Sequence, residues 1–340
     1  MNNHPRDVLN LLSKLTFRRA LNIFKVGLGF YLSRLFQQPF VYGLPVSVSI
    51  EPTTSCNLRC PECTSGLRAF TRPTGMLNEK FFKEITDQLH KDLLYLIFYF
   101  QGEPFLNPQF HKMIEYASSK KIYTATSTNA HFLDSDTAKK TVESGLDRLI
   151  ISVDGTTQEV YQQYRIGGSL EKVLEGARNI VEWKKKLHST KPYVVFQFLV
   201  VHPNEHQIDD AKKLAVETGV DNIVFKTAQV YNYENGNELI PVKEQYSRYK
   251  KTGNGKYIIK NSMFNHCWKL WHSSVITWDG KTVPCCFDKD AKYKMGDLKE
   301  ERFSDIWKGD LYMQFRQSIL KSRKEIDICT NCSEGTRVFS

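Results

Sequence analysis

The feature that most constrains the fold is a regular alternation of short apolar runs with longer amphipathic segments. Six runs occur between residues 46 and 227: VSVSIEP, LLYLIFYF, YTATSTN, RLIISVD, YVVFQFLVV and NIVFK. The segments between them have helical periodicity, and the first of these helices is expected to begin near Asn78, a favourable N-cap. Strands that alternate with helices form right-handed βαβ units and a parallel sheet. Several runs are apolar throughout, as parallel strands covered on both faces require.

Six strands are fewer than the eight that close a (β/α)8 barrel. An open, partial barrel and a doubly wound sheet therefore both fit this α/β pattern. The alternation ends near residue 240, and SSVITWDG then predicts a short strand with a turn at Asp279-Gly280. We expect a helical N-terminal segment over 1–44, a core domain over 45–240 and a small metal-binding α+β domain over 241–340.

Composition narrows the class of protein. The chain has 340 residues, of which 41% are hydrophobic and 25% charged, as is usual for a globular protein. It contains no apolar run near the ~20 residues that span a bilayer, and no signal-peptide layout. We therefore expect a cytoplasmic protein, in which clustered cysteines bind metal rather than form disulfides. The net charge of +10 fits an anionic partner, but we favour a solubilising surface.

Residues 1–40 predict one or two basic amphipathic helices. One interpretation is an interfacial helix on the inner face of an anionic membrane, which would make the protein peripheral. The other, which we favour, is a helix whose apolar side packs on the protein's own body. Gly27 and Gly29 argue against a single long helix. The apolar residues that recur at three- and four-residue steps are Leu9, Leu12, Leu15, Leu21, Phe24, Leu28, Leu32 and Leu35.

Three cysteines follow the first apolar run in the segment SCNLRCPEC, with the spacing C-x3-C-x2-C. The carboxyl ends of parallel strands are where active sites form. Iron–sulfur clusters normally take four thiolates, so three thiolates on a four-iron cluster leave one iron open. A structural zinc site would need a fourth ligand close by, and three free thiols are the remaining alternative.

The segment CNLRCPEC resembles the cluster motif of the radical S-adenosylmethionine (radical SAM) superfamily. Three further segments match that family in the same order, each after a successive apolar run. QGEP (101–104) resembles the segment that contacts the methionyl amine of SAM, and STNA (127–130) ends the third run as TNG does in relatives. SVDG (152–155), followed by Arg165, resembles the stretch that contacts the SAM ribose and carboxylate.

The resemblance implies a partial (β/α)6 TIM-like barrel and a site residue for each motif. It implies that Glu103 accepts hydrogen bonds from the SAM amino group, that Arg165 pairs with the carboxylate, and that Ser152 and Asp154 bind ribose hydroxyls. Glu62 departs from the family, in which this position before the third cysteine is often aromatic. The implied catalytic cluster ligands are Cys56, Cys60 and Cys63, and the implied cofactor-binding residues are Gly102, Glu103, Pro104, Thr128, Asn129, Ser152, Asp154 and Arg165.

The other five cysteines lie beyond residue 260. Cys267 and Cys285 frame a C-x12-G-x4-C pattern, and a C-x2-C pair follows at Cys329 and Cys332. This resembles the SPASM auxiliary-cluster domain in its shortened one-cluster "twitch" form, which implies that these four cysteines bind a second [4Fe–4S] cluster. The glycine spacing favours Cys285 over Cys286 as the ligand. A four-cysteine zinc site also fits the spacing.

The resemblance implies an enzyme that reductively cleaves SAM to a 5′-deoxyadenosyl radical, which takes a hydrogen atom from a substrate carbon. The expected net result is oxidation or rearrangement of the substrate. A flavodoxin- or ferredoxin-type donor would supply the electron. The auxiliary cluster would accept an electron from the substrate radical, so that the substrate is oxidised overall. Alternatively, it would only shape the substrate-binding pocket. A helical N-terminus favours a small-molecule, sugar or lipid-linked substrate over a peptide. The alternatives are a peptide-modifying maturase and a non-catalytic iron–sulfur or zinc protein. No RNA-binding signature is present, so no nucleic-acid partner is expected.

Overall fold

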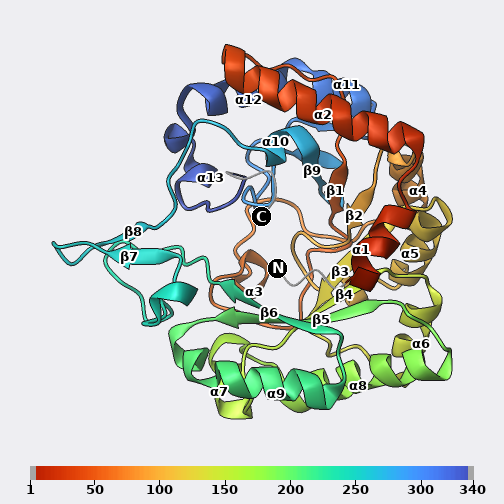
Figure 1. The fold of residues 1–340 in the computed structure, drawn as a ribbon, viewed down its shortest axis with the longest axis vertical. Coiled ribbons are helices and arrows are strands. Elements are labelled where there is room, and N and C mark those ends of the chain that lie inside the picture. Colours follow the sequence, from red (N-terminus) through yellow and green to blue (C-terminus); the bar gives the residue numbers. More distant parts are fainter. Residues whose placement is uncertain (1–4, 336–340) are drawn as a thin grey trace. The chain divides into compact units, whose positions relative to one another are not determined.

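A computed structural model describes residues 5–335 (Figure 1). The described chain divides into two compact units. The first unit contains residues 5–55, 70–125 and 263–335, and the second contains 56–69 and 126–262. No helix among the described residues is both long and apolar enough to cross a membrane. The division at residues 44 and 240 remains a prediction.

The first unit is built on a mixed sheet. β1 (Ser47–Ile50) pairs in parallel with β2 (Tyr95–Ile97) on one side and with β9 (Ser273–Ile276) on the other. β2 pairs in parallel with the start of β3 (Tyr123–Thr128). β10 (Lys281–Val283) runs antiparallel to β9 and to β11 (Gly296–Asp297). The sequence predicted the turn at Asp279-Gly280 between β9 and β10, but not the pairing of β9 with β1.

The helices of the first unit come from both ends of the chain. The C-terminal helices pack on the segment after α2, because Trp271 Nε1 donates to Phe40 O at 3.1 Å and Trp307 Nε1 donates to Gly43 O at 3.0 Å. The helices are α1 (Pro5–Ser13), α2 (Phe17–Phe36), α4 (Glu79–Leu89), η1 (Pro104–Leu106), α5 (Phe110–Ser119), α10 (Lys269–His272), α11 (Phe303–Lys308), α12 (Asp310–Ser322), η4 (Arg323–Glu325) and α13 (Asp327–Thr330).

The second unit contains three parallel strands in sequence order, β4 (Arg148–Ser152), β5 (Tyr193–Val200) and β6 (Asn222–Thr227). The end of β3 belongs to this unit. An antiparallel hairpin, β7 (Tyr249–Lys251) and β8 (Tyr257–Ile259), follows β6. The helices are α3 (Thr64–Leu67), α6 (Ser135–Glu143), α7 (Gln158–Tyr164), α8 (Leu170–Lys186), η2 (His202–Gln207), α9 (Ile208–Thr218) and η3 (Glu244–Tyr246).

All six expected strands are present, and side-chain caps fix where the intervening helices begin. Asn78 Oδ1 accepts from Lys80 N at 2.8 Å at the start of α4, as the sequence predicted. Asp134 Oδ1 accepts from Thr137 N at 2.8 Å at the start of α6. The helical segment after β5 begins as the 3-10 turn η2, where Asn204 Oδ1 accepts from Val201 N at 2.9 Å, and continues as α9.

The N-terminal helices form as expected, but two expectations about them are wrong. α2 continues through Gly27 and Gly29 without a break. Gly29 is needed there, because a Cβ on it would lie 2.6 Å from Phe40 O. The apolar residues expected to pack on the body are exposed, with Leu32 only half-buried. The buried face of α2 consists of Arg19, Asn22, Val26, Gly29, Phe30 and Ser33.

Candidate functional site

The three-cysteine loop is the first segment of the second unit, and the side chain of Arg68 holds it through hydrogen bonds to its backbone oxygens. Arg68 Nη2 donates to Cys56 O at 2.6 Å and Arg68 Nη1 donates to Ser65 O at 2.9 Å. A Cβ on Gly66 would lie 2.5 Å from Cys60 O and 2.6 Å from Cys60 N, so only glycine fits against this loop. Cys63 is the N-cap of the short helix α3. These contacts fix the direction of the loop that carries all three thiols.

The Sγ atom of Cys56 faces nitrogen donors. Leu58 N lies 3.4 Å from it and Asn129 Nδ2 lies 3.9 Å from it. Asn129 Nδ2 also donates to Asn57 Oδ1 at 2.7 Å, so Asn57, which sequence reasoning missed, fixes the amide beside the thiol. The structure thus brings Asn129, at the end of β3, to the cysteine loop. Thr128 instead caps its own turn, because its Oγ1 accepts from Ala130 N at 2.9 Å.

Arg165 links the cysteine loop to Asp154. Its Nη1 lies 3.7 Å from Cys60 Sγ, and its Nε donates to Asp154 Oδ2 at 2.5 Å. Burial raises the pKa of the Cys60 thiol, and the charge of Arg165 opposes that rise. Burial lowers the pKa of Arg165, but Asp154 and Cys60 outweigh it, so its pKa lies well above the ordinary value. A permanent positive charge therefore sits beside the Cys60 sulfur.

Asp154 is fully engaged by the protein. Its Oδ1 accepts from Leu199 N at 2.7 Å, and its backbone oxygen accepts from Asn204 Nδ2 at 3.0 Å. Its side chain thereby orients Arg165. Ser152, the last residue of β4, is buried beside this segment of chain. The ribose contacts implied for Ser152 and Asp154 remain predictions.

The QGEP segment lies in the first unit, against the residue that precedes Cys56. Glu103 N donates to Ser55 O at 2.7 Å. Gly102 has φ +75°, and a Cβ on it would lie 2.2 Å from Thr53 O, so this approach requires glycine. Glu103 is buried, and its Oε1 accepts from Phe105 N at 3.3 Å at the turn begun by Pro104. Gln101 Oε1 is buried and has no hydrogen-bond partner among the described residues. A ligand with a hydrogen-bond donor could satisfy this oxygen.

Glu62 and His131 form further hydrogen bonds within the second unit, near the cysteine loop and the end of β3. Glu62 Oε2 accepts from Tyr231 N at 2.8 Å, so the residue that departs from the family pattern anchors a distant loop. His131 Nε2 accepts from Ser169 N at 2.8 Å, while its Nδ1 lies 2.9 Å from Asn129 O. Burial lowers the pKa of His131, which keeps the imidazole neutral in this role. Sequence reasoning missed His131, since nothing in the local pattern indicated its partner.

The second cysteine set lies in the first unit around a buried arginine. Arg323 Nη2 lies 3.3 Å from Cys332 Sγ and donates to Glu334 O at 2.7 Å. Glu334 N also lies 3.3 Å from Cys332 Sγ. Burial lowers the pKa of Arg323, but Cys267, Cys332 and Cys329 together raise it above its ordinary value. Cys267, Cys329 and Cys332 thus share one cationic partner that sequence reasoning did not find.

Cys285 and Cys286 differ in their surroundings. Cys285 is half-buried and Cys286 is exposed. Burial raises the pKa of Cys285 well above its ordinary value, and neighbouring Cys286, Cys267 and Cys332 raise it further. The pKa of Cys285 thus responds to Cys267 and Cys332 as well as to Cys286, and the choice of Cys285 as the ligand remains a prediction.

The donor sets fit the cofactors that the resemblance implies. Burial raises the pKa of Cys329 to about 11 and that of Cys332 to about 12, so these thiols need bound cations to become thiolates. A backbone amide and an arginine lie near sulfur in both sets, and such donors stabilise an anionic cluster. No three His, Cys, Asp or Glu side chains within residues 5–335 converge closely enough to hold a single metal ion.

Two family profiles match the chain. The radical SAM superfamily profile matches residues 50–215, and the SPASM iron–sulfur cluster-binding domain profile matches residues 267–333. These matches confirm the resemblance seen in the sequence, and with it the two clusters and SAM as cofactors.

Curated relatives and solved structures agree with the profiles. A tungsten-containing aldehyde ferredoxin oxidoreductase cofactor-modifying protein of Pyrococcus furiosus is 26% identical over 84% of this chain and 86% of its own length. Mycofactocin maturase MftC of Mycobacterium ulcerans is 29% identical over 55% of this chain and 48% of its own length. Streptococcus suis SuiB bound to S-adenosylmethionine superposes with TM-score 0.63 at 15% identity, covering 81% of this chain and 68% of SuiB. The superposition confirms the α/β fold, a partial TIM-like barrel with a C-terminal domain.

Proposed function

The chain belongs to the radical SAM superfamily and carries a C-terminal SPASM domain, and we propose that it abstracts hydrogen from a carbon of its substrate. When bound, the open-site [4Fe–4S] cluster and SAM supply a 5′-deoxyadenosyl radical for that step. The tasks of the protein are to hold the cofactors, orient the substrate carbon and exclude water.

Each motif has a task in this proposal. Cys56, Cys60 and Cys63 hold the SAM-binding cluster, and Arg165 offsets its negative charge beside Cys60. Glu103 accepts hydrogen bonds from the amino group of SAM, next to its N-capping contact with Phe105. Ser152 and the chain around Asp154 receive the ribose. Gly102 lets the QGEP segment approach the backbone of Thr53 and Ser55 closely.

One observation carries the proposal. The second unit contains three cysteines, and all three lie on a single loop fixed by Arg68 and Gly66. Two donors from elsewhere in the unit point at sulfurs of that loop: Asn129, which follows β3, and Arg165, which ends α7. A closed structural metal site would instead supply a fourth ligand from its own surroundings.

The proposal is tested by 5′-deoxyadenosine formation. Anaerobic, dithionite-reduced protein is incubated with SAM, and the nucleoside is quantified by mass spectrometry. We expect formation in the wild type and in Cys286→Ala, whose thiol is exposed, but not in Cys60→Ala. Equal formation by Cys60→Ala would overturn the proposal.

The auxiliary cluster has two candidate roles. Cys267, Cys285, Cys329 and Cys332 hold it beside Arg323, whose charge favours its reduced state. It either accepts an electron from the substrate radical, which makes the net reaction an oxidation, or it only shapes the substrate pocket. A flavodoxin- or ferredoxin-type protein is the proposed donor to the first cluster.

We favour a small-molecule or lipid-linked substrate. The Pyrococcus relative, which aligns over 86% of its length, is described as cofactor-modifying. Residues 5–36 form the helices α1 and α2. A peptide or protein substrate is the second candidate, favoured by the maturase relative, whose match spans 48% of that protein.

The class of substrate is tested with fractions of a cell extract. The extract is separated by molecular size, and each fraction is used with and without prior digestion by a protease. A substrate is recognised by accelerated 5′-deoxyadenosine formation in the presence of reductant. We expect the stimulating fraction to be small and to survive proteinase digestion. Loss of stimulation after digestion would assign a peptide, and stimulation removed only by ribonuclease would contradict the expectation that nucleic acid is not a partner.

A further inference from the structure

The most apolar side of α2 faces away from the protein. Phe17 is 86% exposed, Phe24 66% and Leu35 72%. At about 100° per residue, the whole stripe lies on one side of the helix, opposite the buried face that contains Arg19 and Asn22. A helix of a globular protein normally shows the reverse arrangement. We call this stripe the outer face; its members are Phe17, Leu21, Phe24, Leu28, Tyr31 and Leu35.

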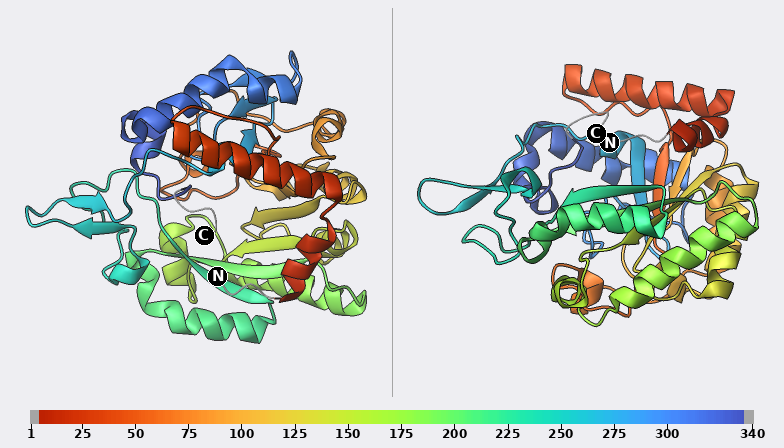
Figure 2. Two further views of the ribbon diagram at one scale, coloured as in Figure 1. Left: turned by 45° about the horizontal axis from the view of Figure 1, so that its top comes forward. Right: turned by 60° about the horizontal axis from the view of Figure 1, so that its bottom comes forward.

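The rotation of α2 is fixed by polar anchors, so the outer face cannot turn inward. The guanidinium of Arg19 is buried and donates to the backbone oxygens of Lys14, Lys121, His90 and Lys120 at 2.5–3.1 Å. Arg18 forms a two-pronged pair with Asp92, with distances of 2.9 and 2.6 Å. Figure 2 shows α2 as the outermost helix of the first unit in its right-hand view.

Cations flank the outer face, and no exposed acid accompanies them. Arg18 and Lys25 lie about a quarter turn to one side of the stripe, and Arg34 lies about a quarter turn to the other. Asp7 is the one acidic residue in the sequence from 1 to 44, and it is buried against Tyr123. Lys25 on one side and Arg34 on the other thus flank the apolar stripe, while Arg18 is paired with Asp92. An apolar stripe flanked by cations is the pattern of a helix that lies in the interface of an anionic bilayer.

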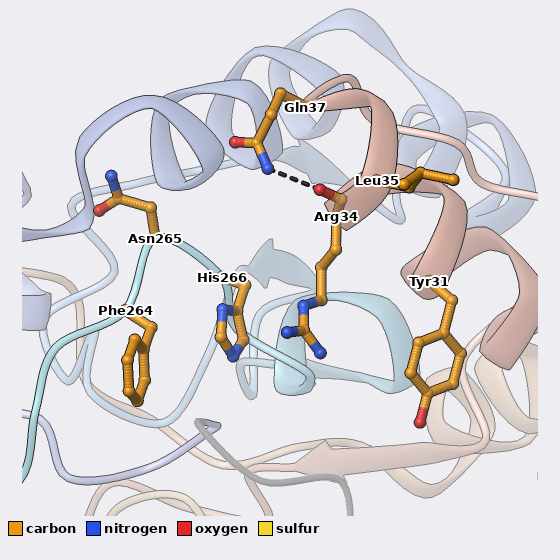
Figure 3. A pocket seen from close by; sticks show the side chains of 7 residues that line it. All are labelled: Tyr31, Arg34, Leu35, Gln37, Phe264, Asn265 and His266. Carbon is orange, nitrogen blue, oxygen red and sulfur yellow. Dashed lines mark hydrogen bonds between the residues drawn. The ribbon is translucent and has the colours of Figure 1, made fainter.

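A hollow at the C-terminal end of α2 extends the same surface. It has a volume of about 530 Å³ and is lined by Tyr31, Arg34 and Leu35 of the helix together with Phe264, Asn265 and His266. Figure 3 shows the Arg34 guanidinium and the His266 ring directed into one space, with Gln37 Nε2 donating to Arg34 O at 2.6 Å. The hollow offers Arg34 to a lipid phosphate at the depth where the cations of an interfacial helix lie.

We propose that the outer face of α2 docks on an anionic phospholipid membrane, with Lys25 and Arg34 at the level of the headgroups. The exposed Leu9 and Leu12 of α1 add apolar area to the same N-terminal region. A second copy of the chain is a poorer occupant, because pairing two outer faces would bring their flanking cations together without an acid between them. This inference concerns docking alone and does not depend on the proposed catalytic function.

Vesicle flotation tests the proposal. The full-length protein is mixed either with vesicles of phosphatidylcholine or with vesicles that also contain roughly 30% of the anionic lipid phosphatidylglycerol. Bound protein is measured after density centrifugation. We expect binding to the anionic vesicles only, and weakening at 1 M salt, where the Debye length is about 3 Å. A triple variant, Phe17→Ser/Phe24→Ser/Leu35→Ser, should lose at least about tenfold in binding, because three large apolar contacts are removed.

Two further variants separate the causes. Val216→Ser/Leu311→Ser removes exposed apolar side chains elsewhere and should bind as the wild type does. Lys25→Glu/Arg34→Glu should lose binding to anionic vesicles while its iron content and circular dichroism stay unchanged. Absence of binding by the wild type, or equal binding to neutral vesicles, would overturn the proposal. A dimer in analytical ultracentrifugation that the triple variant dissociates, without vesicle binding, would assign the face to a second copy.

Discussion

The guanidinium of Arg165 lies 3.7 Å from the sulfur of Cys60, although 105 residues separate them in the chain. Asp154 fixes its other side at 2.5 Å. A cation beside a sulfur that binds an iron–sulfur cluster favours the more negative, reduced state of that cluster. On our proposal that Cys60 is such a ligand, Arg165 acts on the charge of the SAM-binding cluster.

Replacing this cation should change the reduction potential of the SAM-binding cluster. We expect Arg165→Gln to lower the midpoint potential by roughly 50 mV, because the reduced cluster loses a neighbouring positive charge. The measurement is an EPR-monitored redox titration without SAM. Arg165→Lys, which keeps the charge, should shift the potential less. Identical potentials in all three proteins would show that the Arg165 charge does not act on the cluster.

The choice between Cys285 and Cys286 can be made by iron analysis. Cys285→Ala should lose about four irons per chain, the content of one [4Fe–4S] cluster. Cys286→Ala should keep all of its iron, because Cys286 is exposed whereas Cys285 is half-buried and has the spacing from Gly280 that the resemblance favours. The reverse pattern would make Cys286 the ligand and break the match to the glycine spacing.

Gly66 should be indispensable to the cysteine loop. Gly66→Ala places a methyl group 2.5 Å from Cys60 O, and overpacking of this kind costs about 1–3 kcal/mol. We expect a lower midpoint in urea unfolding and a lower occupancy of the SAM-binding cluster. Gly27→Ala is the matched control, because nothing lies within 4 Å of the added methyl group. It should stabilise α2 by roughly 0.5–1 kcal/mol, and equal behaviour of the two variants would contradict the packing at Gly66.

His272 should make the first unit sensitive to acid. Burial, helped by the charge of Lys269, lowers the pKa of His272 from 6.5 to about 4. The unfolded chain therefore binds this proton at a higher pH than the folded chain, and stability is lost as the pH falls from 6.5 towards 4. Between pH 7 and pH 5 we expect a loss of about 2 kcal/mol in the free energy of unfolding. His272→Gln should lack this part of the pH dependence, and an unchanged slope would exclude His272 as its source.

Local patterns predicted the parts of the fold that depend on local physics. The apolar runs became β1 to β6 because buried parallel strands need apolar residues on both faces, and Asn78 capped α4 as its type indicates. The pairing of β9 with β1 could not be read locally, since it joins Ser47 to Ser273 across most of the chain. The amphipathicity of residues 17–36 indicated an apolar face, but not that Arg19 would anchor the opposite one.

The candidate site shows the same division. The spacing of Cys56, Cys60 and Cys63 and the order of the motifs indicated the family, which the profiles confirm. Contacts between distant segments were missed: Asn57 with Asn129, Glu62 with Tyr231, and Arg323 with Cys332. Asn57 and Arg323 do not differ in local sequence from surface residues, so only the folded chain reveals their partners. The SAM contacts implied for Glu103, Ser152 and Asp154 stay predictions.

The central claim is that three cysteines hold an open-site cluster and that four others hold a closed auxiliary cluster, and iron and sulfide analysis with EPR tests it most directly. Anaerobically reconstituted wild type is compared with Cys56→Ala/Cys60→Ala/Cys63→Ala, with and without SAM. We predict about eight irons in the wild type and about four in the variant, with an EPR signal that SAM perturbs only in the wild type. Zinc in place of iron, or a wild-type signal indifferent to SAM, would contradict the claim.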